Sequence, residues 1–146
     1  MTALETMSVT KQKIEDLQRQ IENEVQQQIA NVFKQFLKEH QDVKTIMWAQ
    51  YTPYFNDGDE CVFRVYEFTF CADVMYEYDD DPPNAFSRYT PEEYKPQTVS
   101  NQTVADCEQL ENLLGGMEDA LKLVFGDHCY VIVTEDGITV EEYEHD

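Results

Sequence analysis

Apolar residues recur at spacings of three and four between residues 10 and 41, and this period predicts one long amphipathic helix. Its opposite face is Gln, Glu and Lys, and no Gly or Pro interrupts it. Residues 1–9 are predicted to be a flexible start. The apolar positions are Ile14, Leu17, Ile21, Val25, Ile29, Val32, Phe33, Phe36 and Leu37.

This predicted helix is longer than a small domain needs to cover one sheet, since about 30 residues span ~45 Å. Two interpretations stay open. The first half projects and pairs with another helix or with its own copy, so that residues 10–37 form a homodimer. Otherwise only the half between Val25 and Leu37 packs on the core and the rest frays. The stripe leaves strict heptad spacing after Ile21, which weakens the coiled-coil version.

Two strand patterns follow the helix. Residues 44–51 predict a strand that is edged by Pro53, and the Asn-Asp-Gly-Asp run at 56–59 predicts a tight turn. Residues 61–78 are rich in β-forming residues and apolar on both parities, which predicts a central strand covered on both sides.

A long loop, a second helix and a last hairpin complete the chain. Residues 79–99 are rich in Tyr and Pro and predict a loop. An apolar stripe then predicts a helix that starts near Thr103, with Thr103 and Asp106 resembling a capping box, a kink at Gly115-Gly116 and a cap at Gly126. The strands follow at 128–134 and 138–143.

The predicted order is therefore α-β-β-loop-α-β-β within one domain at 10–146. We expect an α+β fold in which the long helix and the second helix pack on a mainly antiparallel, four-stranded sheet. The 146 residues suit a single domain, and the aromatic content of 12% argues against a disordered chain.

The charge of the chain says more about its function than its length does. The chain has 30 acidic and 10 basic residues, a formal charge of −20. Residues 1–50 carry seven acids and six bases, whereas residues 51–146 carry 23 acids and four bases. Nearly all the charge thus lies after the long helix. Direct nucleic-acid binding and binding to an anionic membrane are excluded as main functions, because both depend on basic side chains.

Candidate chemistry is sparse. The four cysteines (Cys61, Cys71, Cys107, Cys129) form no CxxC pair, and we interpret them as reduced, mostly buried thiols. The Asp-rich turns lack EF-hand spacing, and no zinc, phosphate-loop or nucleophile motif occurs. We therefore expect no enzyme, no metal site and no cofactor. With neither a signal peptide nor a membrane span in the sequence, a cytoplasmic location is expected.

The acidic surface has three interpretations: solubility, attraction of a basic partner protein, and mimicry of nucleic acid by carboxylates spaced like phosphates. Interleaved Tyr and Phe would add contact area of the kind found in binding hot spots.

The segment Gln50-Tyr51-Thr52-Pro53-Tyr54-Phe55-Asn56-Asp57-Gly58-Asp59 resembles a segment of small acidic proteins of tailed phages and bacteria. The resemblance covers 20–30 residues around the first hairpin and the helix before it. It implies a phage or prophage origin, and it brings no activity with it.

We therefore predict a non-enzymatic, acidic protein of the host cytoplasm. It is expected to bind and inhibit or modulate a basic host protein, such as a nucleic-acid-binding enzyme, with DNA mimicry as the form to test first. The alternative is an assembly protein that self-associates through the long helix. The predicted interaction residues are Tyr54, Asp57, Asp59, Glu60, Asp79, Asp80, Asp81, Tyr89, Glu92, Glu93, Glu141, Glu142 and Glu144.

Overall fold

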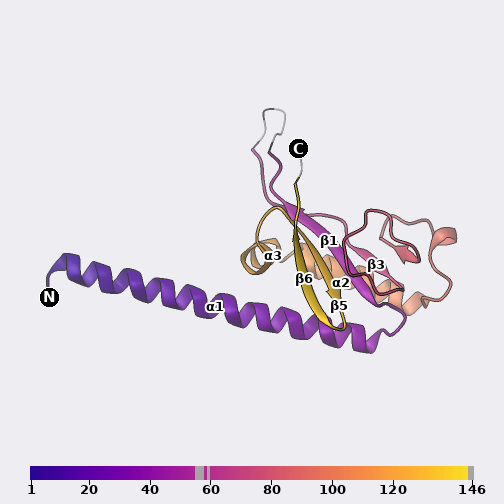
Figure 1. Ribbon diagram of the computed structural model, residues 1–146, viewed down its shortest axis with the longest axis horizontal. Coiled ribbons are helices and arrows are strands. Elements are labelled where there is room, and N and C mark those ends of the chain that lie inside the picture. Colours follow the sequence, from indigo (N-terminus) through magenta and orange to yellow (C-terminus); the bar gives the residue numbers. More distant parts are fainter. Residues whose placement is uncertain (55–57, 59, 145–146) are drawn as a thin grey trace.

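The computed structural model describes residues 1–54, 58 and 60–144. It confirms the predicted α+β class, with helices packed against a mainly antiparallel sheet (Figure 1). In chain order the elements are α1 (Ala3–Glu39), β1 (Thr45–Tyr51), β2 (Arg64–Val65), β3 (Thr69–Cys71), β4 (Ala85–Phe86), the 3-10 helix η1 (Glu92–Tyr94), α2 (Asn101–Gly115), α3 (Glu118–Phe125), β5 (Cys129–Thr134) and β6 (Gly137–Glu142).

The sheet has six strands rather than the four predicted, in the order β4-β3-β1-β5-β6, with β2 also paired to β1. Strand β1 pairs with β5 from Thr45↔Thr134 to Gln50↔Cys129. Along its other edge it pairs with β3 and β2. Because both edges are paired and both faces covered, residues 45–50 are all buried.

The central strand is thus β1, and the prediction of a single central strand at 61–78 is wrong. That segment forms only β2 and β3, and then leaves the edge of β1. The N–H of Ala72 donates instead to the carbonyl of Asn84, at 2.8 Å. Asn84 has a left-handed φ of 52°, which turns the chain into β4. Part of the predicted loop at 79–99 is therefore strand β4 and helix η1.

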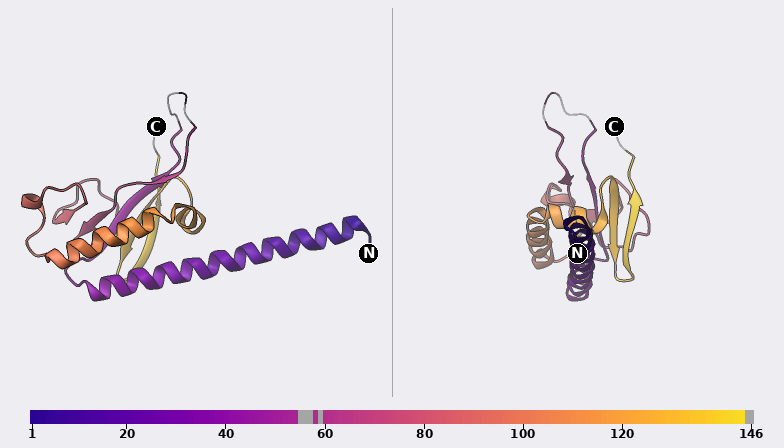
Figure 2. Two further views of the ribbon diagram at one scale, coloured as in Figure 1. Left: turned by 180° about the vertical axis from the view of Figure 1, so that it is seen from behind. Right: turned by 90° about the vertical axis from the view of Figure 1, so that its left-hand side faces the viewer.

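One face of the sheet packs against all three helices. Ile46 and Trp48 of β1 share this core with Phe33 of α1, Leu121 of α3 and Val131 of β5. Trp48 stacks on Phe33 with ring centroids 5.6 Å apart. Figure 2 shows α2 and α3 on one side of the sheet. We call this the helix face and the opposite one the outer face.

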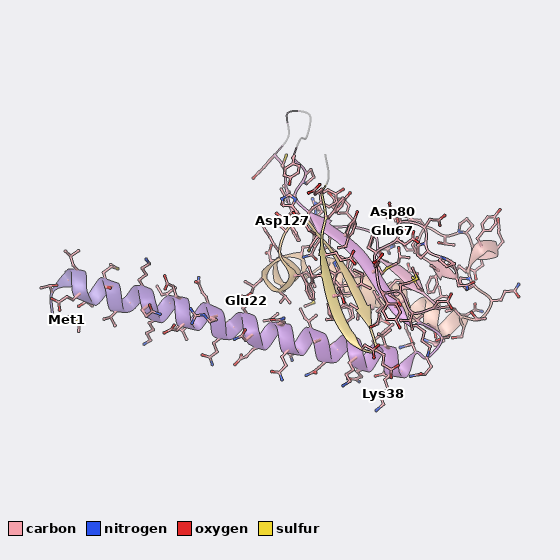
Figure 3. All side chains as sticks on the ribbon, in the orientation of Figure 1. Met1, Glu22, Lys38, Glu67, Asp80 and Asp127 are labelled. Carbon is pink, nitrogen blue, oxygen red and sulfur yellow. The ribbon has the colours of Figure 1, made fainter. Side chains whose placement is uncertain are left out.

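Helix α1 begins at Ala3, so residues 3–9, predicted to be flexible, are helical instead. The sequence signal for this start is Thr2, whose hydroxyl accepts a hydrogen bond from the N–H of Glu5 at 3.2 Å. Residues 1–21 are all exposed. The helix projects from the body as a rod, and its side chains stand clear of the body from Met1 towards Glu22 (Figures 1 and 3).

The predicted second helix is two helices, because the chain breaks at Gly116-Met117 between α2 and α3. Its N-cap is Ser100, whose hydroxyl accepts from the N–H of Thr103 at 3.1 Å. The predicted Thr103–Asp106 capping box is therefore wrong, since Thr103 lies inside α2. The predicted cap at Gly126 is confirmed, with a positive φ of 92° and its N–H donating to Lys122 O.

Hydrogen bonds of Asp42 and His40, which we call the latch, connect the end of α1 to the start of α2. Asp42 accepts hydrogen bonds from the N–H of Ser100 and the hydroxyl of Thr103, both at 2.9 Å. His40 lies 2.8 Å from the carbonyl of Phe36 through Nδ1 and 2.8 Å from Asp106 Oδ2 through Nε2. Both ring nitrogens face acceptors, so the imidazole of His40 is doubly protonated in this arrangement.

We expect this latch to weaken as the pH rises through the raised pKa of His40. Burial by itself lowers the pKa of His40, but the bonds to Asp106 and Phe36 outweigh it, and the pKa is raised. The stabilisation is complete below the ordinary pKa of histidine and is lost as pH rises through the raised value. His40→Gln should lower the free energy of unfolding by about 1–2 kcal/mol near pH ~5.5, and by less near pH ~9, in urea denaturation. An equal loss at both pH values would contradict the protonated latch.

Candidate functional site

The outer face of the sheet carries a second, smaller apolar cluster. Met47, Cys71 and Ile132 are buried there, under Met75 and Tyr78 from the segment 72–84. Thr45 fixes this segment in place. Its hydroxyl donates to the carbonyl of Asp73 at 2.8 Å and accepts from the N–H of Met75 at 2.9 Å. Alternation along β1 places Thr45 and Met47 on the same face, opposite Ile46 and Trp48.

Five tyrosines cross the outer face in one contiguous row, which we call the tyrosine ladder: Tyr78, Tyr130, Tyr143, Tyr51 and Tyr66. Neighbouring ring centroids are 3.7 Å apart for Tyr78–Tyr130, 4.3 Å for Tyr130–Tyr143 and 4.2 Å for Tyr51–Tyr66, and these three pairs are stacked. Tyr51 and Tyr143 meet edge to face at 4.9 Å. The rings cover one another and are half-buried. The ladder is therefore a rigid aromatic surface with little rotamer freedom left to lose on binding.

Carboxylates lie at one end of the ladder. Glu141 is directly opposite Tyr130 in the β5–β6 register, and its Oε2 lies 3.5 Å from the N–H of Tyr78. Burial, the Asp80 carboxylate and Tyr130 together raise the pKa of Tyr78. The pKa values of Tyr130 and Tyr143 are also raised, chiefly by burial, with Asp80 contributing. These phenols stay neutral at physiological pH and can donate hydrogen bonds.

The stem of the first hairpin is fixed to the other end of the sheet. Asp127 accepts hydrogen bonds from the N–H and hydroxyl of Thr52, at 2.8 and 2.6 Å. Burial tends to raise the pKa of Asp127, but these bonds outweigh it and the pKa is lowered, so the side chain is a carboxylate. Tyr54 stacks on His128 with centroids 4.8 Å apart. The N–H of Tyr143 donates to the carbonyl of His128, which connects this end to the ladder.

The structure brings some of the predicted residues together and separates others. Asp79, Asp80 and Asp81 directly follow Tyr78 in the chain, Asp80 acts on the pKa of Tyr78, and Glu141 reaches the N–H of Tyr78 from β6. Tyr54 lies at the hairpin end. Glu142 and Glu144 lie on or after the exposed strand β6, and Glu60 is exposed. Asp57 and Asp59 fall outside the described residues.

The remaining predicted residues do not join this surface. Glu92 and Glu93 lie in η1, and Glu92 Oε2 accepts from Lys95 Nζ at 3.3 Å. Tyr89 is exposed and lies next to Arg88, which contacts α2 through Asn112 at 2.9 Å. The predicted long-loop residues 79–81 and 89–93 thus lie in different parts of the structure, and their role in binding stays a prediction. The acidic face is defined as the tyrosine ladder with Asp79, Asp80, Asp81 and Glu141.

The four basic residues of the body each contact a carboxylate or an aromatic ring. Arg64 lies 3.5 Å from Glu118, Arg88 lies 3.5 Å from Glu108 and 3.7 Å from Glu111, and Lys95 lies 3.3 Å from Glu92. Lys122 Nζ lies 5.4 Å from the ring centroid of Phe63. The segments 65–87 and 123–144 contain twelve acids and no Lys or Arg. These two segments supply four of the five ladder tyrosines and every carboxylate of the acidic face, which is thus not neutralised by a lysine or arginine of its own segments.

The buried thiols are unsuited to nucleophilic chemistry. Cys71, Cys107 and Cys129 are buried, which confirms the prediction of mostly buried thiols, and Cys61 is partly exposed. Burial raises the pKa of Cys71 to about 12 and that of Cys129 to about 11. Thiols with such pKa values hold almost no thiolate at neutral pH.

One buried carboxyl group went unnoticed in the sequence. Glu111 of α2 is buried beside Arg88, and burial raises its pKa against the opposing effect of that guanidinium. Glu111 thus holds α2 against the segment that follows β4.

Among the described residues, no group of three or more His, Cys, Asp or Glu side chains is placed to hold a metal ion. Within the same ranges, no helix has the length and apolar character needed to cross a membrane.

Sequence reasoning also missed the ladder itself, having selected Tyr54 and Tyr89 as aromatic anchors. A usable signal was present, since Tyr130 alternates with the core residue Val131 on β5, and Tyr143 shares the parity of Glu141, which pairs with Tyr130. Both tyrosines therefore belong to the parity opposite the core. The position of Tyr78 depends on the path of segment 72–84, which has no comparable pattern.

A scan against protein-family models, a search of the curated proteins and a search of the solved structures each found no match. The functional conclusions below therefore depend on the residues of this chain.

Proposed function

We propose that this protein is a non-enzymatic interaction protein whose acidic face binds a basic surface of another protein. The observation that carries this proposal is the tyrosine ladder edged by carboxylates in segments without Lys or Arg. Aromatic rings supply contact area, and the carboxylates supply charge that only a partner can complement.

The charge distribution favours a partner over simple solubility. A solvated surface usually mixes both signs of charge. Here the body has 23 acids against four bases. The field of such a face accelerates association with a basic partner and disfavours acidic ones.

The proposed partner is a nucleic-acid-binding protein of a bacterial host. Its basic groove responds to negative potential, and carboxylates on a rigid face offer that potential without a nucleic acid. The resemblance of the first hairpin to acidic phage proteins fits a protein that acts in the host cytoplasm on such a target. The tyrosine hydroxyls would add hydrogen bonds to the arginine and lysine side chains of the groove.

Two variants of equal charge test this proposal. Asp80→Asn with Glu141→Gln removes two charges from the acidic face. Glu92→Gln with Glu93→Gln removes two charges from η1. In pull-downs from bacterial lysate, wild type and the η1 variant should retain the same basic protein. The acidic-face variant should bind it at least ~10-fold more weakly in a direct titration with that protein.

Salt and competition identify the mode of binding. Affinity for the captured protein should fall steeply between low and physiological salt, because the contacts are ionic. A DNA duplex of about 20 base pairs should displace the acidic protein if the two share a groove. Equal weakening by both variants, or an affinity independent of salt, would contradict the proposal.

A further inference from the structure

We propose that residues 3–28 of α1 form an antiparallel two-helix interface with the same residues of a second copy of this chain. This inference concerns the projecting helix and is independent of the acidic face.

The first half of α1 has no support from its own body. Residues 1–21 are all exposed, and the first fully buried residue of the helix is Ile29. The segment makes little helix-stabilising contact beyond Thr2 and a few side-chain pairs such as Lys11–Glu15 at 3.9 Å. Such pairs stabilise a helix only slightly, and most helical stability in proteins comes from packing of an apolar face.

An apolar face suited to packing is present on this half. Met7, Ile14 and Ile21 are seven residues apart, and Leu17 follows Ile14 by three, so they occupy the a and d positions of consecutive heptads. Their exposed fractions are 66% for Met7, 51% for Ile14, 49% for Leu17 and 55% for Ile21. We call these four residues the apolar stripe. Four large apolar side chains in register on a free helix are the signature of a helix-helix seam.

The body reaches this face only near its end of α1, where Val25, eleven residues after Ile14, packs against the core. Further along, it covers Ile29, Phe33 and Leu37, whose spacing of four moves steadily around the helix and away from the stripe. Val32, eleven residues after Ile21, returns to the stripe side and is 50% exposed although it lies next to the buried Phe33. A second helix can therefore lie along the stripe from Met7 to Ile21 without displacing the body.

The charge distribution favours a second copy of this chain as the partner, and it favours an antiparallel direction of the two helices. Residues 1–50 carry a net charge near zero, so two such helices can approach each other, whereas two bodies with 23 acids and four bases each repel. In a parallel pair the two bodies would lie side by side. In an antiparallel pair centred between Glu15 and Asp16, the two bodies join the paired helices at opposite ends. About 35 residues of helix lie between these two junctions, so the bodies lie about 50 Å apart. That distance is roughly six Debye lengths at physiological salt.

This antiparallel register pairs the two central residues of the stripe. It places Ile14 opposite Leu17 of the second copy in an a-to-d layer, and places Met7 and Ile21 opposite Glu24 and Thr10 towards the ends of the seam. Lys11 then approaches Glu22 of the second copy on the flank of the seam, and the two-fold axis repeats the contact. In a parallel pair, Lys11 and Lys13 would instead face Thr6 and Gln18, with no opposite charge.

Sedimentation velocity on the full chain tests the interface. Wild type should show a dimer that dissociates on dilution. Ile14→Asp with Ile21→Asp introduces charges into the seam and should raise the dimer dissociation constant at least ~100-fold. Gln12→Asp with Asn23→Asp adds the same charge on the polar face of α1 and should leave the constant within about threefold. Near-ultraviolet circular dichroism of Trp48 reports that the body stays folded in both variants.

Small-angle scattering of the wild-type dimer tests the direction. The antiparallel arrangement predicts a second maximum near ~50 Å in the pair-distance distribution, from the two separated bodies. A dimer with a single maximum and adjacent bodies would overturn the antiparallel arrangement. A wild-type monomer at all concentrations, or equal dissociation by both variants, would overturn the helix interface itself.

Discussion

Replacing Gln50 by leucine is expected to destabilise the folded protein by about 3–5 kcal/mol, a large part of the total stability of a domain this size. Gln50 is fully buried at the end of β1 on the helix face. Its Oε1 accepts from the indole N–H of Trp48 at 2.9 Å. Its Nε2 donates to the carbonyls of Leu121 at 3.0 Å and Gly126 at 2.7 Å.

The size of this effect depends on how many buried polar groups lose a hydrogen bond to the Gln50 side chain. Leucine fills most of the volume of glutamine but offers no polar atom. The buried Trp48 N–H would then lose its acceptor, and the carbonyls of Leu121 and Gly126 would lose the amide donor of Gln50. A buried polar group left without its partner costs about 1–3 kcal/mol. The substitution also removes the connection between β1 and α3.

Urea denaturation measures the loss, with Gln97→Leu as the control. Gln97 is exposed in the segment between η1 and α2, so its replacement should change the free energy of unfolding by less than ~0.5 kcal/mol. A double-mutant cycle with Trp48→Phe should show coupling, because phenylalanine removes the N–H that Gln50 satisfies. A loss below about 1 kcal/mol for Gln50→Leu would show that the two carbonyls find other donors.

Replacing Tyr130 by alanine is expected to destabilise the fold by about 2–3 kcal/mol and to break the tyrosine ladder. Tyr130 stacks on Tyr78 at 3.7 Å and on Tyr143 at 4.3 Å, so its ring joins the two halves of the row. Each aromatic pair contributes about 0.5–1.5 kcal/mol beyond the area that it buries. The ring also covers Ile132 and Met47 on the outer face.

Matched variants separate the ring from its hydroxyl and from tyrosine content. Tyr130→Phe keeps both stacks and should cost less than ~1 kcal/mol. Tyr89→Ala removes an exposed tyrosine and should have an effect below ~0.5 kcal/mol. Thermal melts and the near-ultraviolet tyrosine signal measure both quantities. If Tyr130→Ala and Tyr89→Ala had equal effects, the ladder would not be a structural unit.

If the proposed function is correct, Tyr130→Ala also weakens partner binding, because Tyr78 and the neighbouring carboxylates lose their support. Tyr130→Phe then binds nearly as well as wild type. This contrast distinguishes a rigid platform from a surface that acts by charge alone, since both variants carry the same charge.

Periodic patterns were the most predictive part of the sequence. The helical period from Ile14 to Leu37 predicted α1, and the strands predicted at 44–51, 128–134 and 138–143 match β1, β5 and β6 nearly to the residue. These elements satisfy their own backbone locally or with a neighbouring strand, so the side-chain pattern alone indicates them. The start at Ala3 was missed because the cap at Thr2 precedes the apolar stripe.

The segment 61–99 was predicted least well. Its β-forming residues indicated one continuous strand, yet the chain leaves the sheet after Cys71. The covering of the outer face by Met75 and Tyr78 depends on contacts with Thr45 and Ile132, which are distant in sequence. Such long-range pairing outweighs local β propensity.

Composition and periodicity are properties of the chain, so they were enough to predict an acidic α+β domain with a nearly neutral long helix. Which acids share a surface depends on the folded structure. The pairing of β1 with β5 and the return of segment 72–84 bring Asp80 and Glu141 to one tyrosine ladder, whereas Glu92 and Glu93 lie elsewhere. Proximity between residues more than sixty positions apart depends on strand register and core packing, and neither is visible in the local pattern.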